Sequence, residues 1–200
     1  LRKIMNFVRE NNLGDGDYLE FGVYKGGNFT EAISAAQGKR LDKMRFHAFD
    51  SFEGLPSPEG IDKYSDQWTK GQVSNSEESF KKTLLQERER VDMGRVTITK
   101  GWFKDTLNDT TKKKLNISKA AVIWIDCDLY ESTIPVLKFV RDYIVDGTII
   151  VFDDWYHFRG NPNYGEQKAF REWLAENPQF KASEFHKYFW HGNSFIINKN

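Results

Sequence analysis

The sequence has little of several features that mark common protein classes. A single cysteine among 200 residues excludes an internal disulfide and a cysteine zinc site, and it fits a reducing, cytoplasmic location. No apolar run reaches the roughly 18 residues of a membrane span, and the N-terminus lacks a secretory pattern. Lys and Arg number 29, as do Asp and Glu, so charge indicates neither nucleic acid nor a membrane as partner. The expected partner is a small molecule.

No linker, repeat or low-complexity tract divides the chain, so we interpret residues 1–200 as one domain. Strand patterns alternate with helical ones, which predicts an α/β fold with a doubly wound, mostly parallel, seven-stranded sheet and an antiparallel C-terminal edge hairpin. Strands are expected at residues 18–23, 45–50, 96–100 and 147–155, in the apolar run that opens residues 120–131, and in a hairpin of residues 184–190 and 194–198. Helices are expected at residues 1–12, 28–38, 76–90, 131–146 and 166–177.

Two of these strands end in carboxylates. Residues 120–131 place Asp126 and Asp128 on one face, about 7 Å apart if the strand stays regular, and residues 147–155 end in Asp153 and Asp154. Neighbouring parallel strands would gather these acids at the carboxyl edge of the sheet, where open α/β folds bind ligands. Their mutual repulsion indicates a bound cation, and all-oxygen ligation favours Mg, Ca or Mn over zinc.

A glycine-containing loop follows the first expected strand. Gly22, Gly26 and Gly27 allow a tight turn, and Asn28 with Glu31 is typical of a helix N-cap and its capping-box partner. Such a loop alone is weak evidence for a nucleotide-type site, and it lacks the lysine-serine/threonine ending of a P-loop.

Asp50 ends the next expected strand, about 25 residues beyond the loop, at a spacing where an adenosine ribose needs a carboxylate. A turn or helix-cap role is the alternative for this residue. Trp102 leaves a further strand at the same edge, where it would either stack on a base or fill the core.

Residues 53–75 are rich in Gly, Pro, Ser and charge and show no sustained periodicity. A loop of this length in a compact domain is usually a lid, a binding loop or disordered. We favour a lid over the active site, with Tyr64 and Trp68 as substrate contacts, and leave plain disorder as the alternative.

Three separated pieces of the sequence coincide in one known pattern. They are the Glu20-x-Gly22-x-x-x-Gly26-Gly27 loop, DSFEGLP at residues 50–56, and DCDLYEST at residues 126–133 followed by FDDW. Together they resemble class I S-adenosylmethionine-dependent methyltransferases, which have a Rossmann-like fold, and specifically the macrocin O-methyltransferase family of sugar O-methyltransferases. The likeness runs from about residue 18 to residue 173.

The resemblance implies a metal-dependent enzyme that moves a methyl group from S-adenosylmethionine to a hydroxyl of a sugar or glycosylated natural product. It implies that a divalent ion, expected to be Mg²⁺, is held by Asp126, Asp153 and Asp154, and that Asp128 is the general base. The residues expected to contact the cofactor are Glu20, Gly22, Tyr24, Gly26, Asn28, Asp50, Ser51 and Trp102.

A more distant likeness is to catechol O-methyltransferases, which share the glutamate, glycine, tyrosine, glycine and polar residue of the loop. They carry asparagine where this chain has Asp154, and the sequence is short at its N-terminus, where relatives carry helices that cover the substrate. Three alternatives therefore stay open: a methyltransferase for a catechol-like aromatic, a cofactor-binding protein without transfer activity, and a nicotinamide dehydrogenase, which would have a fuller glycine motif. A homodimer is compatible with the sequence.

Each predicted site residue also has a purely structural interpretation. Asp153 and Asp154 would cap the turn after their strand, and Asp128 would cap a helix from Ser132. The four histidines show no metal-ligand spacing and are expected to pack or lie on the surface, with His157 alone near the proposed site. Cys127, flanked by acids, is expected to be a buried, inert thiol.

Overall fold

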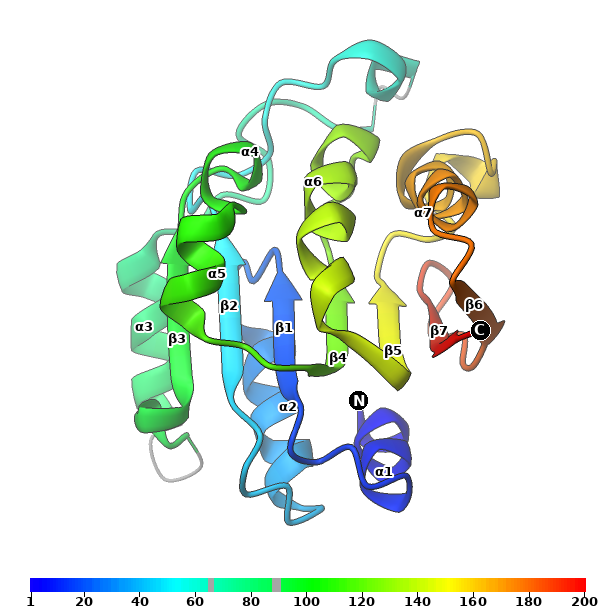
Figure 1. The fold of residues 1–200 in the computed structure, drawn as a ribbon. Coiled ribbons are helices and arrows are strands. Elements are labelled where there is room, and N and C mark those ends of the chain that lie inside the picture. Colours follow the sequence, from blue (N-terminus) through cyan, green and yellow to red (C-terminus); the bar gives the residue numbers. More distant parts are fainter. Residues whose placement is uncertain (65–66, 88–90) are drawn as a thin grey trace.

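A computed structural model of the protein describes residues 1–64, 67–87 and 91–200. Its strands are β1 (Asp17–Phe21), β2 (Phe46–Asp50), β3 (Val96–Lys100), β4 (Ala120–Ile125), β5 (Ile144–Phe152), β6 (Phe180–Glu184) and β7 (Asn193–Lys199). They form one sheet in the order β3-β2-β1-β4-β5-β7-β6 (Figure 1). The strands from β3 to β5 in this order pair in parallel, and β7 pairs antiparallel with both β5 and β6. The predicted mostly parallel sheet with an antiparallel C-terminal edge is confirmed.

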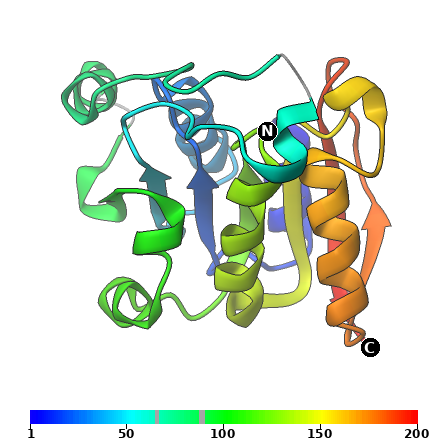
Figure 2. The same ribbon diagram turned by 90° about the horizontal axis from the view of Figure 1, so that it is seen from above.

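Helices cover both faces of the sheet (Figures 1 and 2). One face carries α1 (Arg2–Glu10), α2 (Gly27–Gln37) and α3 (Glu77–Gln86). The other carries α4 (Phe103–Thr106), α5 (Asp109–Leu115), α6 (Tyr130–Val140) and α7 (Gly165–Glu176). Single turns of 3-10 helix lie at Gly60–Tyr64, Met93–Arg95, Arg141–Tyr143 and Phe158–Gly160.

The core has two parts, one on each side of the sheet. Every residue of β1 and β4 is buried, as expected for central strands covered on both faces. Phe29 and Phe80 pack edge to face on the α2 side, with ring centroids 5.6 Å apart, and Phe21 stacks on Phe49 on the other side at 4.5 Å. Many of the abundant aromatic side chains therefore fill the core, where their burial stabilises the fold.

Several predicted boundaries are wrong. The C-terminal hairpin begins with Phe180–Glu184 rather than residues 184–190, and α6 stops at Val140 so that β5 starts at Ile144. Helix α3 ends at Gln86, and the predicted end of that helix at residues 88–90 lies outside the described residues. Helices α4 and α5 were not predicted.

Asn28 is not a helix N-cap. Helix α2 already starts at Gly27, and its N-cap is Gly26, whose φ of 85° is in the left-handed region. The first turn is instead supported by Thr30, whose hydroxyl donates to the carbonyl of Gly26 at 2.9 Å. Within the described part of the chain, no helix is long and apolar enough to cross a membrane.

Candidate active site

Three carboxylates meet where β4 and β5 end. The two strands pair in register up to Ile125 and Phe152, and the ladder continues because the Asp153 N–H donates to the Ile125 carbonyl at 2.9 Å. Asp126 and Asp153 thus follow the last strand residues side by side. Together with Asp154 they offer ligand oxygens that all lie within 4.8 Å of one another. The residues predicted to bind metal are brought together, and their all-oxygen donor set fits Mg²⁺, Ca²⁺ or Mn²⁺.

Burial makes this cluster costly without a counter-charge. It raises the pKa of Asp126 well above the usual range, and the neighbouring Asp153 and Asp154 raise it further. The pKa of Asp153 is raised by the same two causes, burial and then Asp154. Both raised pKa values mean that negative charge on these carboxylates is unfavourable in the folded protein, and a bound cation would offset that cost.

Asp128 does not share a regular strand with Asp126. Strand β4 ends at Ile125, and Asp128 has a φ of 61°, in the left-handed region. The turn lets the Asp128 N–H donate to Oδ2 of Asp154 at 3.1 Å, while the Asp128 side chain lies by the cavity described below. Burial raises its pKa well above the usual range, followed by the charge of Asp154. A raised pKa improves the ability of a carboxylate to accept a proton.

Side chains from the C-terminal part of the chain hold the acids, and the sequence patterns did not predict them. The Tyr188 hydroxyl donates to Oδ1 of Asp153 at 3.0 Å, and Nδ1 of His191 lies 2.6 Å from the Asp153 carbonyl. Glu166, at the start of α7, accepts the Asp154 N–H at 3.0 Å through Oε2. These contacts join residues that are far apart in the sequence, so they cannot be predicted from the local pattern of apolar and polar residues.

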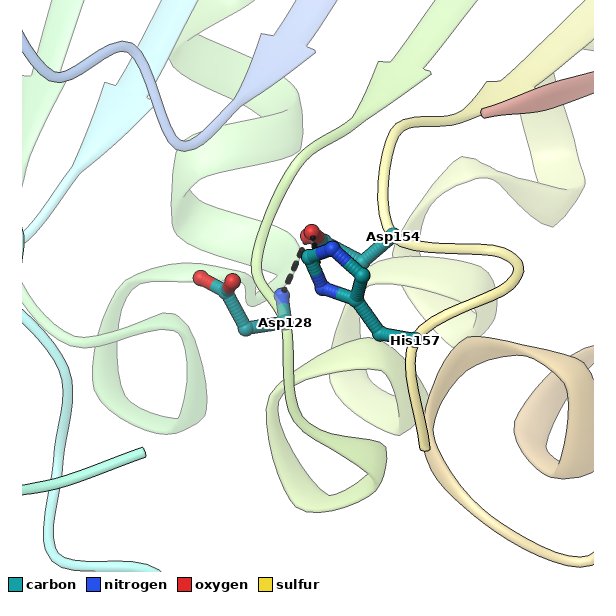
Figure 3. A group of neighbouring side chains, drawn as sticks. All are labelled: Asp128, Asp154 and His157. Atoms are coloured by element: carbon teal, nitrogen blue, oxygen red, sulfur yellow. Dashed lines mark hydrogen bonds and ion pairs between the residues drawn. The ribbon is translucent and has the colours of Figure 1, made fainter. Parts of the chain in front are cut away.

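His157 also faces the acids, as the sequence suggested, but the expectation that it is the only histidine near the site is wrong, because His191 contacts Asp153. Nδ1 of His157 lies 2.8 Å from Oδ1 of Asp154, and Asp128, Asp154 and His157 form a second group with ligand atoms within 4.8 Å of one another (Figure 3). Asp154 belongs to both groups.

A cavity of about 630 Å³ lies beside the acids at the carboxyl edge of the sheet. Five residues of the predicted cofactor set line it, namely Gly22, Tyr24, Asp50, Ser51 and Trp102, together with Asp126, Cys127 and Asp128. The volume is that of sites that enclose drug-sized ligands, which include S-adenosylmethionine.

Gly22 and Asp50 shape the cavity wall. A Cβ on Gly22 would lie 1.8 Å from the Asp126 carbonyl oxygen, and the φ of 87° at this position favours glycine. The close approach of the loop to the backbone of Asp126 therefore requires glycine at this position. Oδ2 of Asp50 accepts the N–H groups of Val23 and Tyr24, at 2.8 and 3.2 Å. Oδ1 accepts the Phe52 N–H at 2.7 Å, so of about four lone-pair sites on the carboxylate Asp50 keeps one for a ligand hydroxyl.

The rest of the predicted cofactor set lies elsewhere. Among the described residues, Glu20, Gly26 and Asn28 do not line this cavity. Glu20 is buried and accepts the Tyr18 hydroxyl at 2.5 Å, and burial raises its pKa to about 8. Their cofactor roles stay predictions.

Described residues of the segment predicted as a lid form part of the cavity wall. Leu55, Pro56, Lys70 and Val73 line it, and the segment lies above the strand ends in Figure 1. Its Asp62 is fully buried and accepts the N–H groups at the start of α6. The capping role considered for Asp128 therefore belongs to Asp62.

The two aromatic residues predicted as substrate contacts pack on protein side chains. Tyr64 stacks on Tyr164, with ring centroids 4.2 Å apart, and Trp68 lies 5.4 Å from His157. Both belong to residues 53–75, of which 65 and 66 lie outside the described residues. A substrate role for Tyr64 and Trp68 stays a prediction.

Cys127 is buried, as predicted. Burial and then the charge of Glu166 raise the pKa of its thiol well above the usual range, which disfavours the reactive thiolate.

Two known proteins of similar sequence are named as O-methyltransferases. The chain is 32% identical over 163 residues to 8-demethyl-8-(2,3-dimethoxy-alpha-L-rhamnosyl)-tetracenomycin-C 4'-O-methyltransferase of Streptomyces olivaceus, an alignment that covers 76% of this chain and 58% of that protein. It is 28% identical over 166 residues to demethyldecarbamoylnovobiocin O-methyltransferase of Streptomyces niveus, covering 78% of this chain and 58% of the relative. The chain thus spans less than two thirds of the length of these relatives.

The fold is that of solved O-methyltransferases. The structure of the O-methyltransferase NovP superposes with a TM-score of 0.81 at 24% identity, over 99% of this chain and 78% of NovP. The calicheamicin methyltransferase CalS11 gives a TM-score of 0.70 at 21% identity, over 97% and 78% of the two chains. The sequence model of the macrocin-O-methyltransferase (TylF) family matches residues 1–175. The chain therefore belongs to the macrocin-O-methyltransferase family.

Proposed function

We propose that this protein is a divalent-metal-dependent O-methyltransferase that moves a methyl group from S-adenosylmethionine to a hydroxyl of a sugar or glycosylated natural product. The observation that carries the proposal is the convergence of Asp126, Asp153 and Asp154 beside a cavity of about 630 Å³ that extends to Asp50. A cofactor-binding protein without transfer activity would need the glycine loop and Asp50 but would have no use for a buried acid cluster.

Each part of the site has a role in this proposal. Asp126, Asp153 and Asp154 would hold the cation, which when bound would lower the pKa of an acceptor hydroxyl that is otherwise too weak an acid at neutral pH. Asp128 lines the cavity and would take the hydroxyl proton, directly or through water.

The cofactor would occupy the part of the cavity near the glycine loop. Asp50 would accept hydrogen bonds from the ribose, and Trp102 would pack against the base. The segment over the cavity would exclude water, which strengthens electrostatic interactions at the reacting atoms.

The class of acceptor is inferred from relatives. One relative is named for a rhamnosyl tetracenomycin, another for demethyldecarbamoylnovobiocin, and CalS11 is described as a TDP-rhamnose 3'-O-methyltransferase. These names favour a sugar hydroxyl on a nucleotide sugar or a glycoside.

A catechol-like aromatic acceptor is the second candidate. Aromatic rings lie next to the acids, with Trp68 and Trp190 packing against His157 at 5.4 and 5.0 Å. Such rings would suit a flat aromatic acceptor with two adjacent hydroxyls.

Calorimetry and turnover together test the proposal. S-adenosylmethionine should bind the intact protein, and release of S-adenosylhomocysteine from a panel of nucleotide sugars, glycosides and catechols should identify the acceptor class. Asp153→Ala should lower turnover at least about 100-fold in the presence of Mg²⁺. The exposed Asp42→Asn serves as the matched control and should behave as wild type.

Absence of cofactor binding would overturn the assignment as a methyltransferase. Unchanged turnover of Asp153→Ala in the presence of chelator would overturn the role of the metal.

A further inference from the structure

We propose that Phe189 and Trp190 bind the uncharged, apolar part of a glycoside acceptor outside the cofactor cavity. Both residues lie in the turn between β6 and β7, and together they are called the aromatic shelf below. The inference rests on the proposed function and deepens it, because it separates a glycoside with an apolar aglycone from a nucleotide sugar as acceptor.

The aromatic shelf is unusually exposed. Phe189 is 88% exposed and Trp190 is 70% exposed, the two largest values for large hydrophobic residues in the described part of the chain. Phe189 also has a φ of 46°, in the left-handed region that a bulky side chain disfavours. Adjacent exposed rings on a strained backbone are typical of a binding surface rather than of a core.

The turn that carries the shelf is fixed to one of the acids. The Tyr188 hydroxyl donates to Oδ1 of Asp153 at 3.0 Å, and Nδ1 of His191 lies 2.6 Å from the Asp153 carbonyl. The backbone N–H groups of Tyr188 and Gly192 donate to each other's carbonyls at 3.1 Å, and a Cβ on Gly192 would lie 2.2 Å from the Tyr188 ring. The shelf is therefore held in place before a ligand binds, which lowers the entropic cost of binding.

Trp190 lies one side chain away from the acids. Its ring centroid is 5.0 Å from that of His157, and Nδ1 of His157 lies 2.8 Å from Oδ1 of Asp154 (Figure 3). Asn193, the first residue of β7, pairs with Phe152, the last residue of β5. The turn before Asn193 therefore lies at the same edge of the sheet as the acids.

The order of the strands places the shelf on the side of the acids away from the cofactor cavity. Residues that follow β1, β2, β3 and β4 line the cavity, and the acids follow β4 and β5. Strand β7, which begins after the shelf, is the next strand in the sheet after β5. An acceptor whose hydroxyl lies at the acids can therefore extend over the shelf without entering the cofactor cavity.

The chemistry of the shelf favours an uncharged ligand. Aromatic rings pack on flat or apolar ring systems, whereas a diphosphate is typically bound by Arg or Lys. Lys187, the residue before the turn, pairs with Glu184 at 3.4 Å and lies 5.7 Å from the Tyr156 ring centroid. An apolar aglycone therefore fits the shelf better than the diphosphate of a nucleotide sugar.

Calorimetric titration of the intact protein in excess Mg²⁺, without cofactor, tests the proposal. The three probes are naphthyl α-L-rhamnoside, methyl α-L-rhamnoside and TDP-rhamnose, with the sugar taken from the names of the relatives. The naphthyl group adds an apolar ring system to the same sugar. We expect the naphthyl glycoside to bind at least about tenfold more tightly than the methyl glycoside, and more tightly than TDP-rhamnose.

Variants assign this preference to the shelf. Trp190→Ala and Phe189→Ala should each reduce the preference for the naphthyl glycoside to less than about twofold. Trp190→Phe, which keeps an aromatic ring, should retain most of it. Leu85→Ala is the matched control, because Leu85 is 56% exposed on α3, at the β3 end of the sheet, and the preference should survive this change. Melting temperatures report whether each variant is folded.

Three binding results would overturn the proposal: no preference for the naphthyl glycoside in wild type, tighter binding of TDP-rhamnose, or an unchanged preference in folded Trp190→Ala. A dimer of wild type that becomes a monomer in Trp190→Ala, measured by sedimentation, would also overturn it, because the shelf would then be an interface between copies. The proposed function fails on different measurements, namely S-adenosylmethionine binding and turnover of Asp153→Ala.

Discussion

Asp62 and Tyr130 are joined across 68 positions of sequence by a hydrogen bond of 2.9 Å from the Tyr130 N–H to Oδ1 of Asp62. Oδ2 of the same carboxylate accepts the Glu131 N–H at 3.0 Å, so one buried side chain satisfies two free donors of the α6 N-terminus. These two hydrogen bonds connect the segment of residues 53–75 to α6, the helix that follows Asp126 and Asp128 in the chain.

Asp62→Ala should therefore affect both stability and ligand binding. We expect a loss of about 1 to 2 kcal/mol in the free energy of unfolding, as for other helix caps, and a weaker affinity for S-adenosylmethionine. Asp92→Ala removes the N-cap of the 3-10 turn Met93–Arg95, at the end of β3 opposite the cavity, and should lower stability without changing cofactor affinity. Denaturant unfolding and calorimetry of both variants check this. Equal cofactor affinity in Asp62→Ala and wild type would contradict the proposed link.

Two glycines of the same loop should respond in opposite ways to alanine. Gly22→Ala brings a methyl group into the Asp126 carbonyl and forces a positive φ on alanine, so we expect loss of several kcal/mol or failure to fold. A Cβ on Gly27 meets nothing within 4 Å, and this residue begins α2. Gly27→Ala should keep or raise stability, by up to about 1 kcal/mol. Thermal unfolding of the two variants tests this prediction. Similar melting temperatures for Gly22→Ala and Gly27→Ala would contradict it.

Glu20 should make the stability of the metal-free protein depend on pH. Its pKa is about 8 in the folded protein and 4.5 ordinarily, because burial disfavours the charged form. Between these two values the unfolded chain loses a proton that the folded protein keeps, so this group's contribution to the free energy of unfolding falls as pH rises from about 4.5 to about 8.

Glu20→Gln removes this titration and keeps an acceptor for the Tyr18 hydroxyl. The stability of wild type relative to the variant should therefore decrease from pH 5 to pH 8, as measured by urea unfolding in chelator. Parallel stability curves for the two proteins would show that Glu20 is ionised in both states.

Tyr188 should position Asp153 for the cation. Tyr188→Phe deletes the hydroxyl that donates to Oδ1 of Asp153 but keeps the ring that packs 5.5 Å from Trp124. We expect Mg²⁺ affinity to fall about tenfold, with little change in melting temperature, because partners that orient metal ligands typically contribute that much.

Tyr143→Phe is the control for this variant. It removes a buried hydroxyl that has no hydrogen-bond partner among the described residues. Calorimetric titration with Mg²⁺ should give the wild-type affinity for it. If the two tyrosine variants bind Mg²⁺ equally well, Tyr188 has no positioning role.

Local patterns in the sequence predicted the fold and the centre of the site well. A continuous apolar run that ends in acids identifies a buried parallel strand reaching the sheet edge, and two such runs placed Asp126 beside Asp153 and Asp154. Boundaries were less accurate between α6 and β5, because the 3-10 turn Arg141–Tyr143 that separates them contains neither glycine nor proline.

The sequence by itself determined the alternation of strands and helices, and the sheet edge at which Asp126, Asp153 and Asp154 gather, because side-chain periodicity reports the local backbone and parallel strands end at one edge. Only the tertiary structure decided that Asp128 turns out of the strand, that Asp62 caps α6, and that Tyr188 and His191 contact Asp153. Those contacts join residues 35 to 69 positions apart or lie in irregular turns, where hydrogen-bond geometry depends on how the whole chain packs rather than on any repeating pattern.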